Sequence, residues 1–444
     1  MRTCAIVRGM SNKSKPRNPD HVRRHNAPGP DNEAIAERIK ELVLPAVIGQ
    51  LAYFRSLGLR DRILSLPVMV AAVLTLLWRQ VPSVCELTRM LAREKFLWVP
   101  QVEVSQQALS KRFLLFPYEV FRRVLLDLVP ALRERALQRR RPLPKSIEYA
   151  RQNFDHIWAV DGSTLEALFR KLKALWDVPV GQLAGKICSV IDLVTHLPVE
   201  TWFRENASDH DSNFLPQILA LAKTGALFIL DRGFYDFTFF DDLLDRGAHF
   251  ITRLKSNAVF SIERTLLKTD RVREYIIKLG GPTSQCQHLL RLIEVRYGTQ
   301  WYRYVTSVLD QNTLPAVYVA DLYRCRWRIE EAFAVLKRLL GLSYLWTGSL
   351  NGILLQVWST WLFYAILIDL ADAVAEELML PFDRISLEMV FRGLYHFIQA
   401  YNRGKATDPV KYLAAPENRD LGVVKRLRKK KPDQIDLDLE AVKL

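Results

Sequence analysis

The sequence predicts an all-α segment followed by an α/β core, in which a mixed sheet is flanked by helices. Three observations lead to this prediction. Residues 31–145 carry apolar side chains at three- and four-residue spacing, which is typical of amphipathic helices. Residues 146–255 alternate short apolar runs with helical segments in the order βββαβαβ. Residues 256–310 carry Val, Ile, Tyr and Thr in short runs, at residues 274–277, 290–295 and 301–308, which indicates a β-rich insertion, so residues 311–400 should complete the core.

Composition and charge divide the chain in the same way. It has 444 residues, 49% hydrophobic and 25% charged, which is enough apolar content for two or three packed domains. The formal net charge is +15, and residues 1–150 hold 26 Lys and Arg against 13 Asp and Glu. The charge excess therefore predicts polyanion binding in the first third of the chain and a different activity in its nearly neutral middle.

The ends and the cysteines limit the class of protein. Residues 1–30 predict a flexible basic arm, and residues 401–444 predict a basic tail. Five cysteines without a CxxC pair indicate neither a disulfide framework nor a zinc site, so we expect a cytoplasmic protein. The most apolar stretch, residues 353–368, includes Gln356 and predicts a buried core helix, so we expect no contact with a membrane.

Five helices are expected in the first segment, at residues 35–47, 67–78, 84–96, 106–113 and 118–135. Ser83 and Ser105 can cap the third and fourth of them. This pair could form a helix-turn-helix in which Lys111 and Arg112 contact DNA, although the connection is longer than a tight turn. An ordinary helical pair is the alternative. Two basic runs, residues 139–141 and 429–431, are expected to contact phosphates or to be solvated.

Two aspartates stand directly after apolar strands of the predicted core. Asp161 follows residues 157–160, and Asp231 follows residues 227–230. Neighbouring parallel strands would bring both carboxylates to one edge of the sheet, where a divalent cation would offset their repulsion. Alternatively, each Asp merely begins a turn. The other predicted elements of the core are strands at residues 186–194, 199–203 and 250–254 and helices at residues 214–223 and 237–244.

A helix predicted over residues 316–341 adds a third carboxylate. At about 100° per residue, its polar residues Tyr323, Arg326, Glu330 and Lys337 fall within an arc of roughly 60°. The opposite face is apolar and should dock on the sheet, which presents Glu330 outward between cations. The alternative is a surface helix with an Arg326–Glu330 ion pair, which leaves the common direction of the four side chains unexplained.

These residues resemble those of the DDE transposases of bacterial insertion sequences, in the cut-and-paste group with a Tyr-x2-Arg-x3-Glu-x6-Lys signature. Tyr323, Arg326, Glu330 and Lys337 reproduce the signature spacing. The segments at residues 161–164, 231–235 and 253–257 also look like blocks of this group, and the resemblance covers about residues 80–400. It implies a ribonuclease-H-like core with a β-rich insertion, an N-terminal DNA-binding domain, and a catalytic, metal-binding triad of Asp161, Asp231 and Glu330.

The resemblance also implies the chemistry of the site. Three carboxylates without His or Cys suit Mg²⁺, for which Mn²⁺ could substitute, and two such ions would clamp an in-line displacement at phosphorus. Arg326 and Lys337 would hold phosphates, and Tyr323 could add a hydrogen bond. Trp301 or Tyr302 would stack a flipped base, a role that Trp327 could share; each could instead fill a small core.

The implied partners are double-stranded DNA, as terminal inverted repeats and target, and a second copy of the chain on paired ends. Such a protein would act in the bacterial cytoplasm, at the nucleoid. Two alternatives remain open, an end-binding repressor that has lost catalysis and a stand-alone metal-dependent nuclease. Residues 209–211, Asp-His-Asp, are better explained as helix-capping and first-turn residues than as a metal site.

Overall fold

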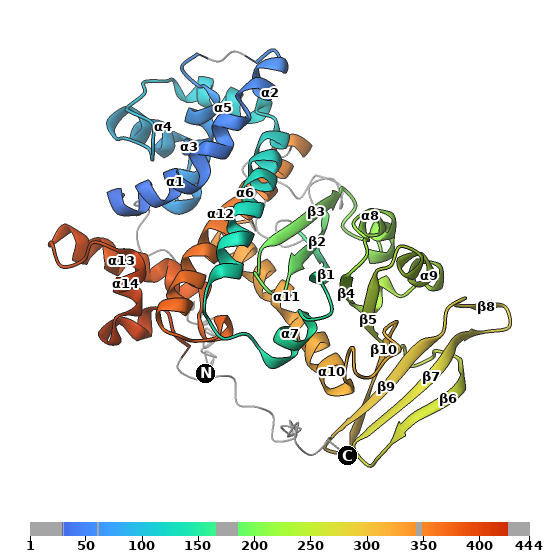
Figure 1. The fold of residues 1–444 in the computed structure, drawn as a ribbon. Helices are drawn as coiled ribbons and strands as arrows, with labels where there is room; N and C mark the ends of the chain where they lie inside the picture. Colours follow the sequence, from blue (N-terminus) through green and yellow to red (C-terminus); the bar gives the residue numbers. More distant parts are fainter. Residues whose placement is uncertain (1–28, 30, 60–61, 166–184, 343–348, 425–444) are drawn as a thin grey trace, which may run out of the picture.

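A computed structural model of the chain describes residues 29, 31–59, 62–165, 185–342 and 349–424 (Figure 1). The N-terminal helices, in blue, and the C-terminal helices, in orange and red, lie together on one side of a long mixed sheet. The basic arm predicted for residues 1–30 lies almost wholly outside the described residues, and so does the basic run at residues 429–431.

The first part of the described chain is helical, as the periodicity predicts. Its helices are α1 (Glu33–Gly49), α2 (Leu51–Ser56), α3 (Leu66–Trp78), α4 (Val84–Arg93), α5 (Gln106–Leu115), α6 (Tyr118–Gln138) and α7 (Lys145–Ala150). Side chains cap three of them locally, because Asn32, Ser83 and Ser105 accept hydrogen bonds from first-turn N–H groups. Buried residues of α1, α3 and α6 share one apolar core with the long helix α12 (Leu350–Glu377), so a separate N-terminal domain stays a prediction.

Within the described residues, ten strands form the sheet, in the order β3-β2-β1-β4-β5-β10-β9-β7-β6, with the short β8 paired to β7. The strands are β1 (His156–Thr164), β2 (Lys186–Asp192), β3 (Pro198–Arg204), β4 (Ala226–Leu230), β5 (His249–Arg253), β6 (Phe260–Lys268), β7 (Val272–Gly281), β8 (Ser284–Gln285), β9 (Leu290–Tyr297) and β10 (Gln300–Thr306). Strands β1, β4 and β5 are parallel, and the other pairs are antiparallel. The mixed sheet flanked by helices that the sequence predicts is therefore present.

The five strands β6 to β10 continue this sheet across β5 and do not form a separate β unit. The sequence analysis did not identify β6, because most of its side chains are exposed and its apolar residues do not alternate regularly. It is an edge strand with two register irregularities, which blunt an exposed edge. Whether this β-rich stretch is an insertion in the family sense stays a prediction.

The two faces of the sheet are covered by different helices (Figure 1). One face carries η4 (Asp211–Phe214), α8 (Leu215–Ala220), η5 (Arg232–Phe234) and α9 (Phe237–Asp245). The other face carries α10 (Ala316–Cys325), α11 (Trp327–Ala334) and the π-helical segment η6 (Val335–Leu339). We call the second face the α11 face. Alternate residues of each strand point to opposite faces. Neighbouring residues of a strand therefore contact different helical layers.

The long helix α12 (Leu350–Glu377) is the core helix that the sequence predicts. It is long and apolar enough to cross a membrane by length and composition, but 94% of its most apolar window is buried within the fold. It is followed by η7 (Phe382–Arg384), α13 (Leu387–Asn402), α14 (Pro409–Ala414) and η8 (Pro416–Leu421). Residues 401–424 are thus folded against α12 and α13, which differs from the basic tail expected there.

Charged residues fix α12 to the preceding helices in what we call the scaffold cluster. Its carboxylates are Asp369 and Asp372, which are 2% and 0% exposed. Arg38, Arg135 and Arg139 pair with Asp369, while Arg139 and Arg141 pair with Asp372. The expectation that residues 139–141 contact phosphates or are solvated is therefore wrong for Arg139 and Arg141, because buried carboxylates require compensating charge inside the protein.

Candidate active site

The ends of two parallel strands place the first two carboxylates. In the β1–β4 pair, Val160 lies opposite Leu230, so Asp161 and Asp231 come directly after the last paired residues. Asp161 still belongs to β1 through its pairing with β2, whereas Asp231 precedes η5. Both side chains follow residues that face α8 and α9, and alternation therefore directs them to the α11 face.

The third carboxylate comes from a helix that is interrupted, not continuous as predicted. α10 ends at Cys325, α11 begins at Trp327, and Arg326 has helical φ and ψ angles between them. Lys337 lies in η6, where the hydrogen bonding changes to the π pattern. This combination alters the angles between the side chains, and π-helical segments are common at functional sites.

The polar face of this helical run points toward the strand ends, not outward as expected. Tyr323 and Arg326 are buried, at 8% and 7% exposure, and the apolar residues Ile329, Ala332 and Leu336 are buried as well. Leu336 and Ile329 belong to the apolar core that includes α12. The helical run is thus buried on both its polar and its apolar side. Periodicity alone could not distinguish this arrangement from a helix with one buried and one solvated side.

Arg326 lies among all three carboxylates. Its Nη1 donates a hydrogen bond to Asp161 Oδ2 at 3.0 Å, and its Nη2 donates one to Glu330 Oε1 at 3.1 Å. Asp231 Oδ1 lies 3.7 Å from the same Nη2. Three acids from β1, the end of β4 and α11 therefore converge on one guanidinium. We call these four residues the site cluster.

Two further residues of the predicted signature contact the strand ends. The Tyr323 hydroxyl donates a hydrogen bond to Asp231 Oδ1 at 3.2 Å. Lys337 Nζ donates to Ser163 Oγ and to the carbonyl oxygen of Thr164, at 2.6 and 2.7 Å. All four signature residues thus lie at the edge formed by β1 and β4, although they come from three helical segments.

The charges in this cluster are not balanced. Burial raises the pKa of Asp161 to about 7; the nearby Asp231 and Glu330 add to the rise, and Arg326 opposes it. Burial alone would lower the pKa of Arg326, but Asp161 and Asp231 outweigh it and raise that pKa, so the guanidinium stays charged. Burial lowers the pKa of Lys337. The site has more negative than positive groups, and at the buried Asp161 and Arg326 little solvent is present to screen them.

The three carboxylates suit a hard divalent cation, but in this structure they surround the guanidinium of Arg326. Asp161, Asp231 and Glu330 offer only carboxylate oxygens, which favour Mg²⁺ or Mn²⁺ over zinc. Within the described residues, no three Asp, Glu, His or Cys side chains are placed to hold one metal ion as they stand. The carboxylates fit the expected cofactor in type and in convergence, and a cation would bind them in place of the guanidinium.

The sequence analysis missed a fourth acid behind the strand ends. Asp211, treated as a first-turn residue, pairs with Lys186 at 2.8 Å and packs against two glycines. A Cβ at Gly162 would overlap Asp211 Oδ1, and a Cβ at Gly233 would lie 2.5 Å from Asp211 Oδ2. The glycine after Asp161 and the glycine two residues after Asp231 are the signal that could have revealed this close approach.

The aromatic candidates lie in different environments. Trp301 lies under Arg273, with 4.2 Å between the guanidinium carbon and the ring centroid. Tyr302 lies near Arg253 at 5.5 Å, and it shares the α11 face with Tyr304, whose ring is 5.4 Å from that of Tyr323. Because neighbouring strand residues alternate, Trp301 points to the other face of the sheet. Trp327 is 57% exposed, beside Arg326.

The two candidates on α5 also differ. Lys111 is exposed, as a DNA-contacting residue must be. Arg112 donates a hydrogen bond to the Leu64 carbonyl at 3.0 Å and stacks over Phe54. Its guanidinium therefore contributes to packing within the helical region, and of the two residues only Lys111 is presented to solvent.

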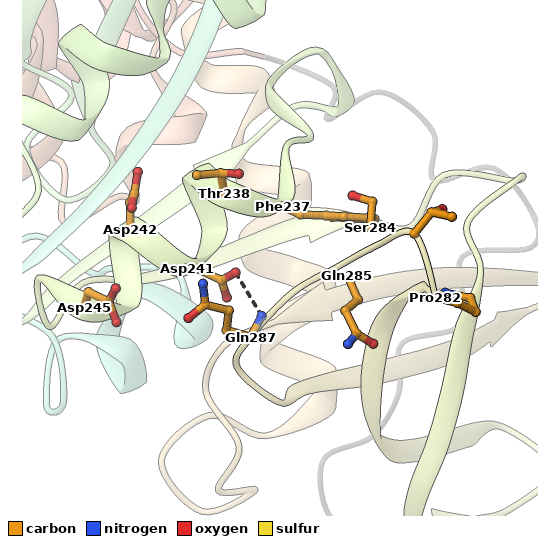
Figure 2. Close-up of a pocket in the computed structure, with 10 residues that line it drawn as sticks. Phe237, Thr238, Asp241, Asp242, Asp245, Pro282, Ser284, Gln285 and Gln287 are labelled. Carbon is orange, nitrogen blue, oxygen red and sulfur yellow. Dashed lines mark hydrogen bonds between the residues drawn. The ribbon is translucent and has the colours of Figure 1, made fainter.

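A cavity of about 320 Å³ lies away from the site cluster, between α9 and the β7–β8 hairpin (Figure 2). Asp241 at its wall accepts hydrogen bonds from the backbone N–H groups of Gln287 and His288, which attach the hairpin to α9. Asp242 and Asp245 add negative charge to its wall. The cavity would repel phosphates, so it does not compete with the strand ends as a candidate site for DNA.

Two comparisons with known proteins agree with this geometry. Residues 153–365 match the family model described as the transposase DDE domain, a region that contains all three carboxylates. A protein from Sinorhizobium fredii named "Putative transposase y4zB" is 26% identical over 157 residues, which is 33% of this chain and 42% of that protein. The chain therefore covers less than half of that relative's length. These matches support a DDE transposase, and the mixed sheet flanked by helices is consistent with a ribonuclease-H-like core.

Proposed function

Since the core of the chain matches the transposase DDE domain, we propose that this protein is a transposase of the cut-and-paste group with the Tyr-x2-Arg-x3-Glu-x6-Lys signature. It binds the terminal inverted repeats of its insertion sequence and catalyses metal-dependent cleavage and transfer of DNA strands. The observation that carries the proposal is the convergence of Asp161, Asp231 and Glu330 at one strand-end edge. DDE transposases generally use divalent metals, and we propose two Mg²⁺ ions here.

The residues around the triad have separate tasks in this proposal. Two bound Mg²⁺ ions would stabilise charge on the attacking and leaving oxygens of the phosphodiester. Asp161, Asp231 and Glu330 would hold those ions. The guanidinium of Arg326 suits bidentate contact with a phosphate, and Lys337, held by Ser163 at the end of β1, adds a point charge. Tyr323 orients Asp231 through its hydroxyl.

Strand cleavage and strand transfer require the same geometry at phosphorus. In cleavage, a water oxygen attacks phosphorus, the bond from phosphorus to the leaving oxygen of the DNA strand breaks, and the proton lost by the water reaches that leaving oxygen through solvent. In transfer, a 3′-hydroxyl oxygen attacks a phosphorus of the target strand, the bond from that phosphorus to its leaving oxygen breaks, and the hydroxyl proton reaches the leaving oxygen in the same way. Burial raises the pKa of Asp161 to about 7 in the absence of a cation, and a bound cation would lower this pKa because it favours the deprotonated carboxylate.

Recognition of the DNA ends is proposed to involve the N-terminal helices, with Lys111 on the exposed side of α5. The proposed functional unit is a homodimer on two paired ends, in the bacterial cytoplasm at the nucleoid. The N-terminal charge excess supports contact with a polyanion. Multiple phosphate contacts predict that affinity for DNA falls steeply with salt concentration.

One experiment separates this function from its competitors. The protein is incubated with DNA carrying the repeats that flank its gene, a target plasmid and Mg²⁺. Joined products support transposition, nicks without joining indicate a nuclease, and shifted but uncut DNA indicates an end-binding repressor. Glu330→Gln should reduce cutting by at least about 10³-fold while end binding persists. Cutting that survives this substitution would contradict the assignment of the triad.

The aromatic candidates allow a finer test. We propose that Tyr302, which shares a face with the triad, stacks a flipped base, and that Trp327 gives further contact at the exposed rim. Tyr302→Ala should raise the activation free energy of the step after first nicking by about 1 to 3 kcal/mol, whereas Trp301→Ala should leave the rate of that step close to that of the wild type. The resemblance implies that the donor ends pass through a DNA hairpin after the first nick, so a time course that separates nicked, hairpin and joined DNA measures both variants. Slowing by Trp301→Ala alone would reverse the assignment.

A further inference from the structure

The guanidinium of Arg326 is the group around which the three carboxylates of the site cluster meet. Two of them accept its hydrogen bonds at 3.0 and 3.1 Å, and the third lies 3.7 Å away. The Arg326 side chain is 8% exposed, and its buried Nε makes no hydrogen bond to any described residue. Its polar contacts within the described chain are thus the acids themselves, with the rings of Tyr323 and Trp327 beside it.

We propose that Arg326 occupies the place of a divalent cation in the DNA-free protein and leaves it when a DNA phosphate binds. The proposal rests on the proposed function. It adds a coupling to that function, because DNA binding and cation binding then promote each other through one side chain.

Competition follows from the oxygens that Arg326 uses. Asp161 Oδ2 and Glu330 Oε1 accept hydrogen bonds from the guanidinium, and the same carboxylates would have to ligate a cation. Two charges of the same sign a few ångströms apart repel strongly in a partly buried site, and the repulsion is twice as large when one of them is divalent. A cation therefore binds the triad only weakly while the guanidinium remains there.

A DNA phosphate gives the guanidinium another partner. Arginine binds phosphate with two parallel hydrogen bonds, much as it binds carboxylates here. The side chains of Asp231 and Glu330 are 36% and 35% exposed, so the cluster is open to solvent on the side of these two acids. A phosphate arriving from that side can draw Arg326 off the triad. By linkage, the cation then raises the affinity for DNA by the factor by which DNA raises the affinity for the cation.

The test measures Mn²⁺ binding to the full-length protein without DNA, from the electron paramagnetic resonance signal of free Mn²⁺. Arg326→Gln should raise Mn²⁺ affinity by about tenfold, a typical size for coupling between two ligands. Arg326→Lys keeps the charge but loses the planar guanidinium, so the Mn²⁺ affinity of this variant should lie between those of the wild type and Arg326→Gln. The matched control is Arg324→Gln, which removes one charge from the same helical run. Arg324 pairs with Asp321 and should leave the affinity within about twofold.

Thermal unfolding gives a second readout that does not depend on activity. Without divalent cations, Arg326→Gln leaves three carboxylates without their internal counter-charge, so its melting temperature should fall below that of the wild type. Mn²⁺ should restore it, because the cation and the guanidinium neutralise the same oxygens. A melting temperature that Mn²⁺ fails to raise more in the variant than in the wild type would overturn the proposal.

Adding a duplex of the terminal repeat tests the coupling itself. In the wild type the duplex should raise Mn²⁺ affinity, and in Arg326→Gln the increase should be smaller by about fivefold or more. Equal increases would contradict the proposal. Glu330→Gln separates the two levels of inference. If it leaves Mn²⁺ binding unchanged, the proposed site itself is wrong. If it weakens Mn²⁺ binding but Arg326→Gln does not strengthen it, only the role of Arg326 fails.

Discussion

The scaffold cluster and the site cluster are both built from buried carboxylates and arginines, but their charges are balanced differently. In the scaffold cluster, four arginines surround Asp369 and Asp372. In the site cluster, one arginine serves three acids. The first arrangement satisfies its carboxylates within the protein, while the second leaves negative charge to be neutralised by something else. The difference distinguishes charge that holds the fold together from charge that prepares a binding site.

The largest effect on stability is expected in the scaffold cluster. Asp372→Ala leaves Arg141, whose side chain is 2% exposed, without its carboxylate. An unpaired buried charge should lower the free energy of unfolding by about 3 to 5 kcal/mol, as measured by urea titration. Mn²⁺ affinity should be unchanged, because α12 does not supply a triad residue.

A surface pair provides the control for this variant. Glu388 and Arg392 are both nearly half exposed on α13, and Glu388→Ala should change stability by no more than about 0.5 kcal/mol. A loss below about 1 kcal/mol in Asp372→Ala would mean that the scaffold cluster is effectively solvated. The contrast between the two clusters would then disappear.

The site cluster should make the stability of the protein depend on pH. The folded pKa of Asp161, about 7, exceeds the unfolded value of about 3.9, so the folded state holds a proton that the unfolded state has lost. Wild-type stability without divalent cations should therefore fall as the pH rises between these two values, by at most about 1.4 kcal/mol per pH unit. Asp161→Asn removes this titration and should be the more stable protein at about pH 8.

Urea titrations in the presence of EDTA, from about pH 5 to about pH 8, measure this difference. The stability difference between the two proteins should be smallest at the acid end, where the wild-type carboxyl is protonated. Identical pH slopes for wild type and Asp161→Asn would show that the site cluster carries no excess negative charge.

The smallest effect is expected behind the site cluster. Gly162→Ala places a methyl group against Asp211 and should cost about 1 to 3 kcal/mol. Adding Asp211→Ala should recover part of that loss, with a coupling energy of at least about 0.5 kcal/mol. Gly281→Ala is the matched control, since its Cβ would meet only Val259 at 3.9 Å. Additive losses in the double variant would mean that Asp211 does not press on the strand end.

Local chemistry explains why much of the fold could be predicted. The capping side chains of Ser83 and Ser105 act on residues three positions away, so the sequence contains the whole interaction. The apolar runs of β1 and β4 are buried on both faces and therefore continuous, which made them recognisable. The edge strand β6 has no such burial and was missed for that reason.

The candidate site was predictable in part. Asp161 and Asp231 could be placed together because each follows a buried strand, and strand ends meet by a general rule of sheet geometry. The register of β10 decides which of Trp301 and Tyr302 points to the α11 face. That register is set by the pairing of β10 with β5 and β9. The packing role of Arg112 depends on Phe54, which is distant in sequence.

Local patterns were sufficient to predict five N-terminal helices, the buried strands β1 and β4, and the positions of three acids and their basic neighbours along the chain. Tertiary packing, in contrast, placed Arg326 among the three acids, Arg139 and Arg141 in the scaffold cluster, and Asp211 behind Gly162. The difference lies in the range of the interactions. Propensity, capping and periodicity act within a few residues, whereas an arginine finds its carboxylates only after distant segments have packed together.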